Sequence, residues 1–160
     1  NKTLAKVLTN IPEADWQVFS KHCEKPMTID NMEIKPVEHS AFLESLLTCK
    51  GVLCGAGFET PAEALYLGKK LMVIPMQNQY EQQFNAAALK GLGVPVVKKL
   101  KLSKTDMIRE WVNTDYRIEI NYPDMNDRII NAIFEMYVEG KFQRGKWQDK
   151  CQLTRGRKGK

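Results

Sequence analysis

Residues 52–63, with the sequence VLCGAGFETPAE, run from an apolar stretch through a glycine-rich turn into a segment of helical character. We predict a buried strand over Gly51–Cys54 and a helix that begins at Pro61. The helix should stop at Gly68, because glycine tolerates the left-handed conformation that commonly follows a helix. Such a strand–turn–helix leaves backbone N–H groups free at the helix start, where an anion can bind. The run therefore indicates a phosphate site.

Two other interpretations compete for the same run. Thr60-Pro61-Ala62-Glu63 fits a capping box, with Thr60 as N-cap and Glu63 reaching back to it, and such a box needs no ligand. Taken alone, the run favours neither the box nor the phosphate site. A dinucleotide fold is disfavoured, because Thr60 replaces the third glycine of G-x-G-x-x-G and the next strand ends at Gln77 without an acidic ribose ligand.

Strand and helix patterns alternate along the chain on both sides of this run. Apolar spacing predicts helices over residues 4–11, 81–90, 105–113 and 126–138, and a further helix that begins with Ser40 as its N-cap. It predicts strands near 16–19, 32–34, 71–74 and 94–97. This alternation predicts an α/β fold: a Rossmann-like parallel sheet with helices on both faces. Ligands of such sheets bind beyond the carboxyl ends of the strands, which selects the loops at 55–60 and 76–80.

The second loop is rich in amides. Residues 75–86, PMQNQYEQQFNA, place six amide side chains and one carboxylate at a strand-to-helix junction. Such groups hydrogen-bond the hydroxyls of sugars. A solvated, polar helix start explains the same composition without a ligand.

Composition narrows the class of protein. The 160 residues are 43% hydrophobic and 27% charged, values typical of one globular domain, and they contain no apolar run long enough to cross a bilayer. We expect no secretory leader, and the cysteines (Cys23, Cys49, Cys54 and Cys151) form no C-x-x-C pair. We therefore expect a cytoplasmic protein with reduced thiols, no metal and no other cofactor.

The net charge of +5 is concentrated at one end of the chain. Residues 141–160 hold eight basic residues and one acid, whereas residues 1–140 hold sixteen basic residues and eighteen acids. Residues 1–140 therefore have a net charge close to zero, which does not predict a nucleic-acid-binding face. We expect a domain over 1–140 and a flexible basic tail over 141–160, which either attaches the protein peripherally to an anionic membrane or is simply solvated.

Together the two loops resemble the donor-binding signature of GT-B glycosyltransferases, the group that holds the peptidoglycan N-acetylglucosaminyltransferase acting on lipid I and the UDP-glycosyltransferases. Gly57, Thr60 and Glu63 keep the register of that signature, and Gly68, Pro75, Glu81-Gln82 and Asn85-Ala86 follow in the same order. The chain departs from the plant pattern at the leading histidine, which is Gly55 here, and in a loop two residues longer before Glu81.

The resemblance implies a role for each matching position. Gly55, Ala56, Gly57 and Thr60 would bind the donor diphosphate, Glu63 the ribose, Val37, Glu38 and His39 the base, and Gln79, Glu81, Gln82 and Asn85 the sugar. The chain would then be a C-terminal lobe that binds a UDP-sugar for metal-independent, inverting transfer.

On the same resemblance, the acceptor and the catalytic base would belong to an N-terminal lobe. This chain would carry no catalytic residue and would be inactive alone. A sugar-nucleotide 2-epimerase lobe and a separate donor-binding subunit of a split glycosyltransferase remain alternatives.

Overall fold

The computed structural model describes residues 2–120 and 124–138. Internal contacts divide the chain into two units, Asn1–Ile120 and Asn121–Lys160. The basic tail expected over residues 141–160 lies outside the described residues.

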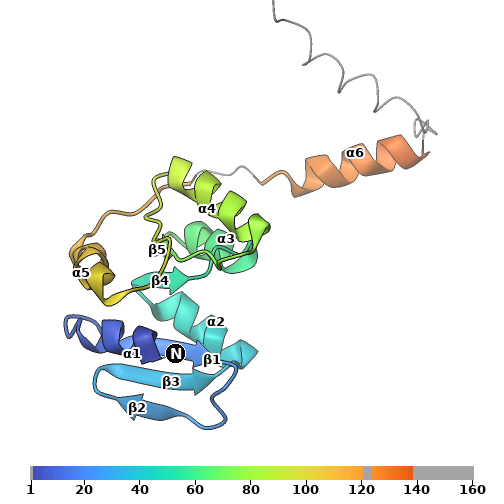
Figure 1. The fold of residues 1–160 in the computed structure, drawn as a ribbon. Helices are drawn as coiled ribbons and strands as arrows, with labels where there is room; N and C mark the ends of the chain where they lie inside the picture. Colours follow the sequence, from blue (N-terminus) through green and yellow to red (C-terminus); the bar gives the residue numbers. More distant parts are fainter. Residues whose placement is uncertain (1, 121–123, 139–160) are drawn as a thin grey trace, which may run out of the picture. The chain divides into compact units, whose positions relative to one another are not determined.

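The first unit alternates helices and strands along most of its length (Figure 1). Its elements are α1 (Lys2–Thr9), β1 (Trp16–Ser20), β2 (Met27–Ile29), β3 (Met32–Pro36), α2 (His39–Thr48), β4 (Gly51–Cys54), α3 (Glu59–Tyr66), β5 (Lys70–Val73), α4 (Tyr80–Gly91), the 3-10 turn η1 (Leu102–Lys104) and α5 (Thr105–Asn113). The predicted α/β class, with parallel strands and helices, is confirmed.

Strands β4 and β5 pair in parallel, with Gly51 opposite Lys70 and Cys54 opposite Val73. The strand predicted at 94–97 is reduced to one parallel bridge between Val73 and Val96. The bridge places residue 96 beside the carboxyl end of β5. It extends this side of the sheet without a third full strand.

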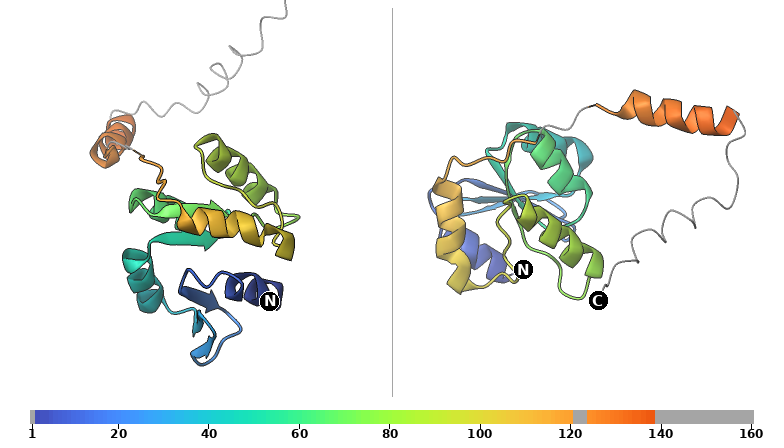
Figure 2. Two further views of the ribbon diagram at one scale, coloured as in Figure 1. Left: turned by 90° about the vertical axis from the view of Figure 1, so that its left-hand side faces the viewer. Right: turned by 90° about the horizontal axis from the view of Figure 1, so that it is seen from above.

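Helices cover both faces of the β4–β5 pair. On one face, Leu71 and Val73 of β5 belong to a core cluster with residues of α2, α3 and α4. On the other face, Met72 belongs to a second core cluster with residues of α1 and α5. Ile74, just after β5, packs against this second cluster. Figure 2 shows α5 next to α1 in both views. This alternation, with period two, is what a strand buried on both faces requires.

A second sheet has the order β1-β3-β2. Strands β1 and β3 are parallel, and β2 pairs antiparallel to β3 through a turn at Asp30, whose φ is 51°. Strand β2 was not predicted. All three of its residues are exposed, so no buried face marks them in the sequence.

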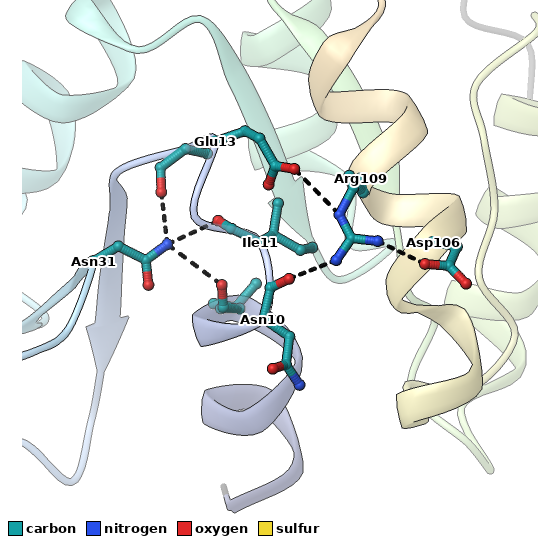
Figure 3. A network of polar contacts seen from close by, with 8 residues as sticks. Asn10, Ile11, Glu13, Asn31, Asp106 and Arg109 are labelled. Atoms are coloured by element: carbon teal, nitrogen blue, oxygen red, sulfur yellow. Dashed lines mark hydrogen bonds and ion pairs between the residues drawn. The ribbon is translucent and has the colours of Figure 1, made fainter.

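Two polar side chains tie α1 to its neighbours (Figure 3). The Asn31 Nδ2 amide, at the start of β3, donates to the carbonyl oxygens of Ile11 and Ala14 at 2.8 Å each. On α5, the Arg109 guanidinium donates to the Asn10 carbonyl at 2.7 Å and pairs with the Glu13 carboxylate at 3.3 Å. The segment that follows α1 is therefore held from two sides.

At the start of β5 lies a buried lysine. Lys70 is 8% exposed, and its Nζ donates to the carbonyls of Val112 and Thr114 at 2.7 Å each, at the end of α5. Burial lowers the pKa of its ammonium group, and the charge of Asp115 acts in the opposite direction. The carbonyls at a helix C-terminus are natural acceptors for a cation.

The second unit contains α6 (Asn126–Val138), as the periodicity predicts. Its large apolar side chains are exposed in this unit: Ile129, Ile130, Ile133, Phe134 and Tyr137. None of the helices that the structure describes combines the length and the apolar character of a membrane span.

The predicted N-cap of α2 is wrong. Helix α2 begins at His39 with Glu38 as its N-cap, and Ser40 lies inside the first turn. The Ser40 hydroxyl donates to the Glu38 carboxylate instead of capping the helix.

Asn31→Asp should destabilise the first unit. The substitution keeps the shape of the side chain but places a carboxylate against carbonyl oxygens that now receive N–H donors. We expect a loss of about 2–4 kcal/mol in the free energy of unfolding, measured by urea denaturation at pH 7. Asn10→Asp is the matched control, because only the backbone carbonyl of Asn10 takes part in the network. Equal stability of the two variants would contradict this account of Asn31.

Candidate functional site

A cavity of about 430 Å³ lies between the first predicted loop and the start of the helix that follows the second loop. Its lining comes from the end of β4, the glycine turn, the start of α3 and the first turn of α4: Cys54, Gly55, Gly57, Phe58, Glu59, Thr60, Pro61, Glu81 and Gln82. Both loops follow the carboxyl ends of the parallel strands β4 and β5, as expected for a ligand site in such a sheet.

The capping-box interpretation of Thr60 is wrong. Helix α3 begins at Glu59, its N-cap is Phe58, and no side chain caps it. Thr60 and Glu63 both lie within the helix. Of the first four helical positions, Pro61 has no N–H, and the Ala62 N–H donates to the Phe58 carbonyl at 3.3 Å. The N–H groups of Glu59 and Thr60 thus lie uncapped at a helix start that borders the cavity, which favours anion binding there.

The two glycines of the turn differ in the space around them. A Cβ atom at Gly57 would have no heavy atom within 4 Å, whereas one at Gly55 would lie 3.3 Å from the Gln82 Oε1 atom. Neither has the left-handed φ that would itself demand glycine. The packing of the protein therefore crowds a side chain at Gly55 but leaves open space at Gly57.

Three amides of α4 hold the second loop and the glycine turn. The Gln82 Oε1 atom accepts from the Met76 N–H at 2.9 Å, and the Gln83 Nε2 amide donates to the Met76 carbonyl at 3.0 Å. Farther along α4, the Asn85 Nδ2 amide donates to the Ala56 carbonyl at 3.2 Å. These bonds fix Gln82 at the cavity and fasten α4 to the glycine turn.

The cavity is acidic. Glu59 and Glu81 are among its lining residues, which include no lysine, arginine or histidine. Burial raises the pKa of the Cys54 thiol to about 12, so this group stays protonated at neutral pH and is no nucleophile. Among the residues that the structure describes, no three metal-binding side chains are grouped as a metal site requires.

Five of the predicted site residues line the cavity together: Gly55, Gly57, Thr60, Glu81 and Gln82. The remaining predicted residues are outside its lining. Ala56 is fully buried in the core, and Asn85 bonds the glycine turn. Glu63 is exposed on α3, and Gln79 is exposed before α4. Residues 37–39 are exposed from the end of β3 to the first residue of α2. Their roles in ligand binding stay predictions.

Four lining residues were missed by the sequence analysis: Cys54, Phe58, Glu59 and Pro61. All four lie in the run 52–63 that was singled out as a phosphate site. Glu59 and Phe58 could have been included by treating the whole turn, and not only the positions of the signature, as ligand-facing.

The chain matches a protein-family model. The model, described as "Glycosyl transferase family 1", matches residues 1–114, which include every element from α1 to α5 and both loops of the cavity. The chain therefore belongs to glycosyl transferase family 1. Comparisons with curated proteins and with solved structures found no significant match.

Gly55→Ala and Gly57→Ala should differ in stability. The new methyl group at position 55 displaces the Gln82 amide and weakens its bond to Met76, which should cost about 1 kcal/mol. At position 57 the methyl group meets no other atom. Because alanine also lowers the conformational entropy of the unfolded chain, stability should stay unchanged or rise by up to about 1 kcal/mol. Thermal unfolding of both variants measures the difference. A loss at position 57 as large as that at 55 would show that the turn is packed differently.

Proposed function

We propose that this chain is the C-terminal donor lobe of a GT-B glycosyltransferase and binds a nucleotide sugar, in the first instance a UDP-sugar, in the cavity between the glycine turn and α4. One observation carries the proposal: a single cavity joins an uncapped helix start, suited to a diphosphate, to a carboxylate and an amide, suited to sugar hydroxyls. Membership of a glycosyl transferase family gives that combination its chemical meaning.

The diphosphate lies against the backbone of the turn Gly55–Gly57 and the N–H groups of Glu59 and Thr60. The open space at Gly57 lets the ligand approach the backbone closely, which a side chain would prevent. Beside it, Glu81 and Gln82 take the sugar hydroxyls. The Gln82 Oε1 atom is already bonded to Met76, so Gln82 offers its Nε2 amide as a donor.

The more distant contacts of the nucleotide are proposed from the resemblance. Glu63 binds the ribose hydroxyls, and residues 37–39 bind the base. Gln79 and Asn85 bind the sugar together with Glu81 and Gln82, and Asn85 also holds the turn through its bond to the Ala56 carbonyl.

Transfer itself needs a second lobe that supplies the acceptor and the general base. The part of the reaction proposed for this lobe is to stabilise the departing nucleotide diphosphate without a metal. The N-terminus of α3 concentrates about half a positive charge for that purpose. Inversion at the sugar, a cytoplasmic location and peripheral attachment to an anionic membrane through residues 141–160 complete the proposal.

Gly57→Ala should weaken donor binding without loss of stability. The methyl group fills space that the diphosphate needs, and we expect at least about a tenfold rise in Kd, which corresponds to 1.4 kcal/mol. Titration of UDP-, GDP- and dTDP-sugars by calorimetry measures the Kd and identifies the base. Gly91→Ala is the matched control, because a Cβ there also has no heavy atom within 4 Å.

The same titration tests the proposal as a whole. Binding of the preferred donor should be unchanged by excess EDTA. A chain that binds none of the panel, or a Gly57→Ala variant that binds as the wild type does, would contradict a donor site at this turn.

Glu63→Gln should lower donor affinity if Glu63 binds the ribose. Loss of a charge-assisted hydrogen bond corresponds to a rise of roughly 10- to 150-fold in Kd. Because Glu63 caps nothing and lies on the exposed side of α3, the fold should not change. Glu44→Gln is the control, because Glu44 is an exposed residue of α2. Unaltered affinity in both variants would place the ribose elsewhere.

A further inference from the structure

The acidic character of the cavity conflicts with the charge of its proposed ligand. Glu59 is the first residue of α3, and its own N–H is one of the two uncapped donors at that helix start. A phosphate held by this N–H group therefore lies close to the Glu59 side chain. No lysine, arginine or histidine of the cavity lining offsets that carboxylate.

Internal structure does not explain Glu59. Within the part of the chain that the structure describes, its side chain makes no hydrogen bond and no ion pair. An acid in the first turn does stabilise a helix through the macrodipole, by a few tenths of a kcal/mol up to about 1 kcal/mol. That general effect has no bearing on which nucleotide binds, so the two roles can be separated by experiment.

We propose that Glu59 is a specificity-determining residue that distinguishes the nucleotide-sugar donor from the nucleoside diphosphate product by charge. This inference rests on the proposed function of the cavity as a donor site. Glu59 tolerates the diester diphosphate of the donor and disfavours the terminal phosphate of the product. Its effect is to promote release of the product and to limit inhibition by it.

The charge difference follows from the reaction. The bond between the anomeric carbon and the β-phosphate oxygen breaks, and its electron pair stays on that oxygen. The acceptor hydroxyl oxygen forms the new bond to the anomeric carbon and loses its proton to the base of the second lobe. The nucleotide product therefore leaves with one more negative charge than the donor carried, since a terminal phosphate has lost its second proton well above pH 6.

The test compares two ligands on three proteins. Calorimetry at pH 8 and low salt gives the Kd of UDP-N-acetylglucosamine and of UDP for the wild type, Glu59→Gln and the control Glu44→Gln. In Glu59→Gln the ratio of the Kd for UDP to the Kd for the donor should fall about threefold to fivefold, as expected for one added charge near an exposed carboxylate. The change should fade in 0.5 M NaCl, and the control should leave the ratio unaltered.

The possible failures have different meanings. If Glu59→Gln binds both ligands with the same two Kd values as the wild type, the role of Glu59 is overturned and the donor site stands. An equal gain in affinity for both ligands also overturns it, because the carboxylate then repels phosphate without discrimination. Absence of binding for both ligands in the wild type overturns the UDP-sugar site itself and this inference with it.

Discussion

Burial of β5 on both faces is the constraint on which the rest of the first unit depends. Alternate residues of this four-residue strand face two different clusters, one formed with α2, α3 and α4 and the other with α1 and α5. Because all four residues are buried, a shift of one residue in register would exchange the two faces. The strand therefore fixes where its carboxyl end lies, and with it the loop that carries Glu81 and Gln82 to the cavity.

The two ends of the β4–β5 pair differ in character. At the amino end, Gly51 and Lys70 face each other, and the Lys70 ammonium group binds the last carbonyls of α5. At the carboxyl end, the N-terminus of α3 is uncapped and borders open space. One helix terminus is thus satisfied by a side chain of the protein, whereas the other is left for solvent or a ligand. This contrast is the physical basis for placing the function at the carboxyl end.

Local patterns predicted most of the fold and the centre of the site, because apolar periodicity and glycine turns are local signals. Gly68 has the left-handed φ of 62° that its place after α3 predicts. Strand β2 and the start of α3 escaped prediction, since β2 has no buried face and Thr60 is a plausible N-cap in isolation. The structural role of Asn85 depends on a contact with Ala56, 29 residues away, which no local pattern records.

The thiol of Cys54 has a consequence for the chemistry of the cavity wall. Oxidants and electrophiles attack the thiolate form of cysteine, and a pKa of about 12 leaves almost none of it at neutral pH. The sulfur atom directly before the glycine turn should therefore react slowly with peroxide. This cavity wall should keep its shape and its charge under oxidative stress that would convert a more acidic cysteine to a sulfenate.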